Sequence, residues 1–319
     1  MRRALAVLLS LAGGAQAQGT AGVAAIWVSG ETAITVAGDT HAGGRPVTEA
    51  DAWHIGSMTK AMTATLAGRL VARGVLDWDT PVESLLDAAP PWHGVTLAQL
   101  LTHRSGMAAN PSRLVLLRRP DRATYVGQML RSRPAAARGT FLYSNAGYTV
   151  AGAMLQAATG RTWEDLIAAD VWGPLGMQGM GFGAPNGIWG HAPSPWPPGP
   201  KADNIPAMAP AGTVHAPPAA MLRFLAAHAT RDPAFLPPEV WERLQAPMGD
   251  YAMGWSVQDG TLQHAGTNTA WLAQMAIRGD RAVFVAVNGY GTAAEAAVRS
   301  ATQAAMTVAP PAMPKAPRP

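Results

Sequence analysis

The chain has 319 residues, of which 48% are hydrophobic and 14% are charged. This composition can bury a large core, and it is too polar for a protein that crosses a membrane many times. The formal net charge is +4, which falls to +2 without Arg2 and Arg3, because 22 basic residues then oppose 20 acidic ones. The basic residues are scattered along the chain and therefore predict no nucleic-acid partner. The sequence has no cysteine, which excludes disulfides and thiolate metal sites.

The first residues are typical of a secretory signal. Arg2 and Arg3 precede an apolar run from Ala4 to Leu11, and Ala15-Gln16-Ala17 is a small-residue cleavage pattern. The apolar run is too short to span a bilayer. We therefore predict a signal peptide at 1–17, no stable membrane span, and a mature protein that is exported to a periplasm or secreted.

The first half of the mature chain predicts a hairpin followed by a series of helices. Alternating runs at 23–30 and 32–39 are typical of two paired strands. A helix is predicted to begin near Ser57, in a segment that is apolar or small on all sides and is therefore expected to be buried. Further helices are predicted at 96–103, 121–132 and 162–177, and the segment 143–160 is predicted to be a loop that passes into a helix. Gly160 ends that helix, and Thr162 caps the next.

The segment 179–218 is rich in proline and glycine. A long irregular segment inside a globular chain is usually a functional lid or loop, or else disordered. Trp189 and Trp196 lie within it, and two hypotheses stay open for them: they line a cleft, or they pack on the surface.

The C-terminal part predicts a helix at 218–229, strands at 252–258, 261–266, 269–279 and 282–289, and a last helix at 293–306. Strands at both chain ends and helices between them indicate an α/β (α+β) fold. We expect an antiparallel sheet flanked by helices and formed from both chain ends, plus an all-helical lobe. The predicted domain organisation is a single domain at 18–309, with a sheet domain at about 20–75 and 250–308, a helical lobe at about 76–249, and a disordered tail at 310–319.

Lys60 is unusual in this chain, in which only three of the 24 basic residues are lysines. It is the only charged residue in its predicted helix before Arg69. Burial of an ammonium group is costly, so the pKa of Lys60 should fall, and the positive end of the helix acts in the same direction. An amine that loses its proton near neutral pH can act as a base, whereas an arginine stays charged.

Ser57 precedes this lysine by three residues, which places the two side chains within reach of each other on a helix. A serine hydroxyl becomes a good nucleophile when a base takes its proton. Ser57 and Lys60 are therefore a candidate nucleophile and general base. The bare pattern arises by chance about once in a few hundred residues, so it needs support from elsewhere in the chain.

Two further motifs give that support. Tyr143 and Asn145 lie at a predicted loop-to-helix junction, where a phenol can transfer protons and an amide can hold a substrate carbonyl. His264, Gly266 and Thr267 lie on a predicted strand, where the glycine would let a substrate approach the backbone. The N–H groups of Ser57 and Thr267 could then form an oxyanion hole.

With these motifs the chain resembles the serine β-lactamase and penicillin-binding-protein superfamily. The branch it resembles contains class C β-lactamases, DD-carboxypeptidases, D-aminopeptidases and related esterases. The residues that carry the resemblance are Ser57-Met58-Thr59-Lys60, Tyr143-Ser144-Asn145 and His264-Ala265-Gly266, in the family's order, with support from Leu100 to Met107 and from Pro210 to His215. The resemblance covers roughly Ala24 to Met306.

The resemblance implies a β-lactamase/transpeptidase-like fold with the site in the cleft between sheet and helical lobe. It also implies acylation of Ser57 and hydrolysis of that acyl-enzyme by water, with no cofactor. Lys60 and Tyr143 would share the proton transfers, and Asn145 would orient the substrate. The resemblance leaves the carboxylate that would activate the deacylating water unidentified.

His264 departs from the family pattern, because penicillin-recognising members usually carry lysine there to attract the substrate carboxylate. A histidine is mostly neutral at neutral pH and is a weaker anion anchor. The sequence therefore favours an esterase or D-amino-acid-type peptidase acting on a small-molecule ester, amide or D-peptide. The alternatives are a β-lactamase and a non-catalytic penicillin- or cell-wall-binding homologue. The sequence leaves the oligomeric state open.

The other histidines are interpreted structurally. His54 is predicted to be a hydrogen-bonded core or turn residue, and His103 is predicted to fix a turn. The eight histidines show no compact ligand spacing such as His-x-x-x-His, so no metal site is predicted.

Overall fold

The computed structural model describes residues 21–192, 194–268 and 270–307. The predicted signal peptide at 1–17 and the predicted tail at 310–319 lie outside these residues. Within the described part of the chain, no helix is both long and apolar enough to cross a membrane.

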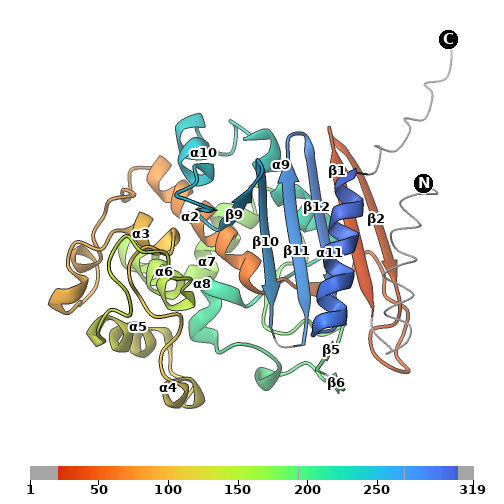
Figure 1. Ribbon diagram of the computed structural model, residues 1–319, viewed down its shortest axis with the longest axis horizontal. Helices are drawn as coiled ribbons and strands as arrows, with labels where there is room; N and C mark the ends of the chain where they lie inside the picture. The colour runs from red at the N-terminus through yellow and green to blue at the C-terminus, as the bar shows by residue number, and fades with distance from the viewer. Residues whose placement is uncertain (1–20, 193, 269, 308–319) are drawn as a thin grey trace, which may run out of the picture.

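A seven-stranded antiparallel sheet forms the right half of the molecule in Figure 1. Its strand order is β2-β1-β12-β11-β10-β9-β8. The strands are β1 (Gly22–Val28), β2 (Glu31–Ala37), β8 (Tyr251–Ala252), β9 (Trp255–Gln258), β10 (Thr261–Thr267), β11 (Leu272–Arg278) and β12 (Arg281–Val287). Strand β1 pairs with β12 from Gly22 opposite Val287 to Val28 opposite Arg281. The structure thus confirms the predicted antiparallel sheet made from both chain ends.

The longer helices are α2 (Thr59–Ala72), α5 (Arg122–Arg131), α6 (Asn145–Thr159), α9 (Pro218–Thr230), α10 (Pro238–Gln245) and α11 (Thr292–Thr307). The shorter ones are α3 (Leu97–Leu101), α4 (Arg113–Leu117), α7 (Trp163–Ile167) and α8 (Ala209–Gly212), with a π-helical turn, η4 (Ala168–Trp172), after α7. Single 3₁₀ turns are η1 (Gly56–Met58), η2 (Val82–Ser84), η3 (Pro90–Trp92), η5 (Pro200–Ala202) and η6 (Pro206–Met208).

Helices cover both faces of the sheet. Helix α11 lies over β11 and β12 in front of the sheet in Figure 1, where its apolar residues pack against a separate cluster of valines and Leu272. Helix α2 passes on the opposite face, beside the helical lobe that contains α3, α5 and α6. Helix α9 falls within the sequence range expected for the helical lobe, yet it packs against β1 and β12 of the sheet.

Several of these helices begin at a residue whose side chain acts as an N-cap. The Thr96 hydroxyl accepts from the Gln99 N–H in a capping box, and the Asp121 carboxylate accepts from the Thr124 N–H. Thr162 caps α7 in the predicted way. Each such cap stabilises its helix by about 1 kcal/mol. At the other end of α6, Gly160 adopts the left-handed conformation, with φ of 69°.

The segment 179–218 forms short elements instead of one irregular loop. Strands β4 (Gly181–Phe182) and β7 (Val214–Ala216) join β3 (Trp53–His54) in a three-stranded sheet, in the order β3-β7-β4. Strands β5 (Gly190–His191) and β6 (Pro195–Trp196) pair with each other. Because β3 immediately precedes η1, this segment is tied directly to the turn that carries Ser57.

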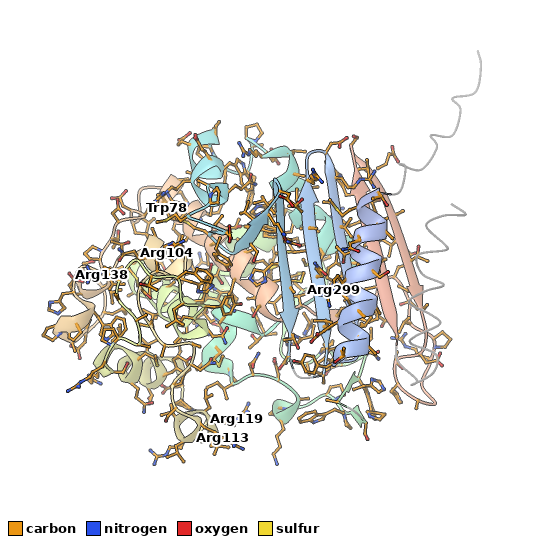
Figure 2. All side chains as sticks on the ribbon, viewed as in Figure 1. Trp78, Arg104, Arg113, Arg119, Arg138 and Arg299 are labelled. Carbon is orange, nitrogen blue, oxygen red and sulfur yellow. The ribbon has the colours of Figure 1, made fainter. Side chains whose placement is uncertain are left out.

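Arginine side chains fix several surface loops. Figure 2 shows Arg113, the first residue of α4, and Arg119, which follows that helix, while Arg104 and Arg138 lie together elsewhere in the helical lobe. Arg119 donates to the Pro200 carbonyl at 2.8 Å, and Arg138 donates to the His93 carbonyl at 2.6 Å. These guanidinium groups satisfy carbonyls at two 3₁₀ turns, since Pro200 begins η5 and His93 follows η3.

Candidate active site

Ser57 lies in η1, the single turn between β3 and α2. Backbone hydrogen bonds hold this turn in place, because the Ile55 N–H donates to the Val214 carbonyl of β7 at 3.0 Å. The Thr59 hydroxyl donates back to the Gly56 carbonyl at 2.7 Å. Ser57 itself is half-buried, so its hydroxyl stays accessible from one side.

Lys60 is fully buried in the first turn of α2, with 0% of its surface exposed. Its Nζ lies 2.9 Å from Ser57 Oγ, 2.7 Å from Asn145 Oδ1 and 2.7 Å from the Ala211 carbonyl oxygen. Burial holds the pKa of Lys60 well below its ordinary value of 10.5. A neutral amine has two N–H donors and one lone pair. It can therefore donate to Asn145 and Ala211 and accept the proton of Ser57.

Tyr143 lies beside this pair. Its ring centroid is 4.9 Å from Lys60 Nζ. Burial raises the pKa of Tyr143 to about 12, and a hydrogen bond with Ser57 acts in the opposite direction with a smaller effect. Near neutral pH the phenol therefore keeps its proton. It is placed to donate a proton to a leaving group and is unsuited to take the first proton from Ser57.

Asn145 is the first residue of α6, and Ser144 caps that helix by accepting from the Gly147 N–H at 2.8 Å. The Asn145 Oδ1 is the acceptor for Lys60, while its Nδ2 donates to Asn110 Oδ1 at 3.1 Å. The helix start thus fixes the backbone of Asn145, and the lysine fixes the orientation of its amide.

Strand β10 and the turn η1 pack backbone against backbone. A Cβ atom on Gly266 would collide with the Ile55 carbonyl oxygen and would lie 2.9 Å from the Ser57 nitrogen. A Cβ atom on Gly56, whose φ is +50°, would lie 2.6 Å from the Thr267 nitrogen. Only glycine fits at either position. The structure therefore brings the backbones of Ser57 and Thr267 together, as a two-donor oxyanion hole requires.

His264 is on the buried side of β10, with 6% of its surface exposed. Its Nδ1 lies 2.7 Å from the Ala265 carbonyl oxygen and its Nε2 lies 3.2 Å from the Tyr251 hydroxyl. The carbonyl can only accept, so Nδ1 carries the proton and Nε2 accepts from Tyr251. Burial, with the nearby Lys60, lowers the pKa of His264 to about 4. The imidazole is therefore neutral at neutral pH, and both its nitrogens are used inside the protein.

The two tryptophans of the 179–218 segment have other contacts. Trp189 stacks on His41, with ring centroids 4.0 Å apart and planes inclined by 13°. Trp196 is in β6 and is 36% exposed. Neither ring is among the contacts around Ser57 described above.

His103 adjoins the site, although its sequence context indicated only a turn. Its Nδ1 accepts from the Ser144 N–H at 3.0 Å, and its ring centroid lies 4.3 Å from that of Tyr143. The residue has a φ of 59°, which is rare for a side chain other than glycine. Burial lowers its pKa to about 2, so the ring is neutral. In the sequence, the segment "LLTHRSG" was the signal that pointed to His103. The contact between His103 and Tyr143 arises only in the folded chain.

No group of three or more His, Asp or Glu side chains among the described residues is arranged to hold a metal ion. The site is instead a hydroxyl, an amine and an amide joined by direct hydrogen bonds, with a phenol ring 4.9 Å from the amine and two backbone N–H groups packed beside them. These groups can perform acyl transfer to a serine without a cofactor.

Comparisons with known proteins agree with this geometry. A family model described as "Beta-lactamase" matches residues 10–306. The unguisins hydrolase ungD of Aspergillus violaceofuscus is 36% identical over 136 residues, which cover 38% of this chain and 24% of that protein. Penicillin-binding protein 4 of Amycolatopsis lactamdurans is 30% identical over 165 residues, which cover 48% of this chain and 42% of that protein. The chain thus spans less than half the length of these two relatives.

Among solved structures, the crystal structure of SurE superposes with a TM-score of 0.80 at 22% sequence identity. The superposition covers 98% of this chain and 78% of that one. This likeness shows that the two chains share a fold. The crystal structure of a penicillin binding protein from Bacillus halodurans also superposes, with a TM-score of 0.76 at 22% identity over 88% of this chain and 94% of that one, which confirms the predicted β-lactamase/transpeptidase-like architecture.

Proposed function

The chain belongs to the beta-lactamase family, and from this membership we propose that it is an exported serine hydrolase that works through an acyl-enzyme on Ser57. The observation that carries the proposal is the environment of Lys60, a buried amine whose Nζ lies 2.9 Å from Ser57 Oγ. The predicted signal peptide supports export.

Acylation begins when neutral Lys60 takes the proton of Ser57 as Oγ attacks the substrate carbonyl carbon. The Oγ–C bond forms, and the negative charge moves to the carbonyl oxygen. The N–H groups of Ser57 and Thr267 stabilise that oxyanion, a contribution that typically accounts for about 3 kcal/mol of the barrier per donor. Asn145 orients the substrate.

Collapse of the tetrahedral intermediate breaks the bond between the carbonyl carbon and the leaving group. Tyr143 gives its proton to that leaving group, and the proton held by Lys60 restores the phenol. Water then attacks the acyl-enzyme, neutral Lys60 takes its proton, and the proton returns to Ser57 Oγ as the acid product leaves. Each turnover therefore consumes one water and restores Ser57, Lys60 and Tyr143.

An ester or a D-amino-acid-type peptide is the favoured substrate class, and the state of His264 supports this choice. The side chain carries no charge at neutral pH and is hydrogen-bonded to Tyr251 and Ala265. A carboxylate-bearing substrate such as a β-lactam would find no cation at this position. An ester has no carboxylate to bind there, so the absence of a cation does not weaken its binding.

Covalent labelling tests the nucleophile. A serine-directed fluorophosphonate should label the wild type and leave Ser57→Ala unlabelled. Ser84→Ala is the matched control, because Ser84 is exposed and its hydroxyl only donates to the Pro81 carbonyl. Full labelling of Ser57→Ala would contradict the assignment of Ser57.

A three-substrate panel tests the substrate class. We expect turnover of a chromogenic short-chain ester at a higher kcat/KM than for a cephalosporin. A D-Ala-D-Ala peptide, whose free C-terminus also carries a carboxylate, should likewise be a poorer substrate than the ester. Preference for the cephalosporin would identify a β-lactamase. Stable acylation by penicillin without turnover of any of the three would identify a binding homologue.

A further inference from the structure

His54 is joined to the turn that carries Ser57. Its side chain is buried, and its Nδ1 accepts from the Gly56 N–H at 3.0 Å. Because Nδ1 accepts, the proton of the neutral imidazole is on Nε2. That Nε2 lies 3.0 Å from Asp203 Oδ1, so the ring bridges a backbone amide of the nucleophile turn and a carboxylate 149 residues away.

Asp203 comes from the segment 179–218, just after η5. Its side chain is 5% exposed. Besides His54, its Oδ1 accepts from the Asn204 N–H at 2.6 Å and from the Asn268 side-chain amide. The Nδ2 of Asn268 and the Nε2 of His54 are 3.1 Å apart, as expected for two donors that share one acceptor.

Asn268 directly follows Thr267, the second candidate donor of the oxyanion hole. The three side chains, which we call the His54 cluster (His54, Asp203 and Asn268), therefore connect η1, the end of β10 and the 179–218 segment. Trp271 packs over the His54 ring with centroids 5.5 Å apart and planes inclined by 24°. This stacking restrains the ring in the orientation that its two hydrogen bonds require.

We propose that the His54 cluster sets the geometry of the oxyanion hole by holding the Gly56–Ser57 backbone against Thr267. The inference rests on the proposed function. Its members are positioning residues, because their contacts are with the backbone and with one another. The 179–218 segment would then act on catalysis through Asp203, at a distance from the substrate.

Close packing between η1 and β10 makes the geometry of the oxyanion hole sensitive to the hydrogen bond between the Gly56 N–H and His54. A Cβ atom on Gly56 would already meet the Thr267 nitrogen at 2.6 Å, so the turn and the strand have little room to shift independently. A displacement of about 1 Å in a reacting group can cost about 100-fold in rate. Release of the Gly56 N–H from His54 would allow such a displacement of the Ser57 nitrogen.

The two carboxylate oxygens of Asp203 differ in the number of hydrogen bonds that they accept. Oδ1 accepts from three donors, whereas Oδ2 has no hydrogen-bond partner among the described residues. Asp203 also lines a cavity of about 500 Å³ together with Phe182, Gly183 and Thr213. An asparagine at position 203 can keep its oxygen on the three donors and turn its NH₂ group toward the cavity. An alanine loses the acceptor.

The experiment compares Asp203→Asn and Asp203→Ala in the full chain. Glu164→Ala is the matched control, because Glu164 lines the same cavity but pairs with Arg122. The measurements are kcat and KM for a chromogenic ester, the rate of fluorophosphonate labelling, the Tm, and the hydrogen–deuterium exchange of the peptide that contains Gly56.

We expect Asp203→Ala to lower kcat and the labelling rate about 10- to 100-fold, with KM nearly unchanged. The Gly56 peptide should exchange about tenfold faster. Asp203→Asn should stay within about threefold of the wild type in every measurement, as should Glu164→Ala. If Asp203→Ala does not fold, Asp203→Ser replaces it, since a serine hydroxyl is one bond too short to reach His54.

Wild-type kcat and Gly56 exchange in the alanine variant would overturn the proposal. An equal loss of kcat in Asp203→Asn and Asp203→Ala would also overturn the proposal. The side-chain oxygen that accepts the hydrogen bond from His54 would then not explain the effect. The exchange measurement does not depend on activity. A wild type that is inert and unlabelled would therefore refute the proposed function, while the exchange rates would still decide whether Asp203 holds the turn.

Discussion

The Nζ of Lys60 lies 2.7 Å from the Oδ1 of Asn145, a residue 85 positions further along the chain. With the Ala211 carbonyl oxygen also at 2.7 Å, two acceptors occupy two of the directions around the amine. The remaining direction leads to Ser57 Oγ at 2.9 Å. Burial favours the neutral amine, whose lone pair can then face the hydroxyl. The contacts of one side chain thus define both the base and the proton that it removes.

The neutral state of Lys60 predicts a pH-dependent difference in stability between the wild type and Lys60→Met. Between the lowered pKa of the folded protein and 10.5, the unfolded chain holds a proton on this lysine and the folded chain does not. The stability of the wild type relative to Lys60→Met should therefore rise with pH, by about 1.4 kcal/mol per unit between the folded-state pKa and 10.5.

Urea unfolding of both proteins at pH 7 to 9.5 measures this slope. The loss of three hydrogen bonds in Lys60→Met adds an offset that does not vary with pH, so the slope is the informative quantity. A difference in stability that is constant over this range would mean that Lys60 is charged in the folded protein.

Lys60→Arg should lose turnover, because the side chain keeps a positive charge but can no longer accept a proton. We expect kcat to fall about 100- to 10,000-fold, the usual contribution of a general base. Lys201→Arg makes the same change at an exposed lysine and should leave kcat unchanged. Circular dichroism and Tm establish that each variant is folded, and near-normal rates in Lys60→Arg would refute the base role.

Gly266→Ala should remove activity by forcing β10 away from η1. The new methyl group would collide with the Ile55 carbonyl oxygen, so the Thr267 and Ser57 nitrogens must separate. Loss of one oxyanion donor costs about 100- to 1,000-fold in kcat. Gly199→Ala is the control, because a Cβ atom there meets no atom within 4 Å and the backbone is extended. Equal kcat in the two variants would argue against the proposed hole.

His103 is expected to position Tyr143 and the start of α6. His103→Ala removes the acceptor for the Ser144 N–H while keeping the strained φ of 59°. His103→Asn supplies an acceptor and tolerates that φ better than alanine does. We expect a loss of about tenfold in kcat for the alanine variant and a smaller loss for asparagine. The opposite order of the two variants would show that neither the acceptor nor the backbone conformation matters.

His264 should make the protein less stable in acid. Its pKa of about 4 in the folded protein lies below the ordinary value of 6.5, so the unfolded chain takes up the proton first. Stability is therefore lost as pH falls from about 6.5 to about 4, at about 1.4 kcal/mol per unit for this group. His264→Gln should reduce the slope by that amount in urea unfolding. An unchanged slope would mean that the folded protein already carries the charge on His264.

Elements with a clear pattern were predicted from the sequence, and elements that depend on packing were not. The hairpin of β1 and β2 and the cap at Thr162 were confirmed, since alternation and capping are local properties. Helix α4 was not predicted, because its five residues are too few to show a helical period. The predicted strand at 252–258 is two strands, β8 and β9, separated by a turn at Gly254 with φ of 83°.

The sequence determined the chemical identity of this protein's candidate site: a lysine without charged neighbours three residues after a serine, followed by a tyrosine, an asparagine and a strand glycine in a fixed order. These features are residue types and spacings, which a linear chain displays directly. Only the tertiary structure decided the partners of His54, His103 and His264, and the charge states of His103 and His264. A pKa depends on burial, and a hydrogen bond between His54 and Asp203 joins residues 149 positions apart, so both arise only when the chain folds.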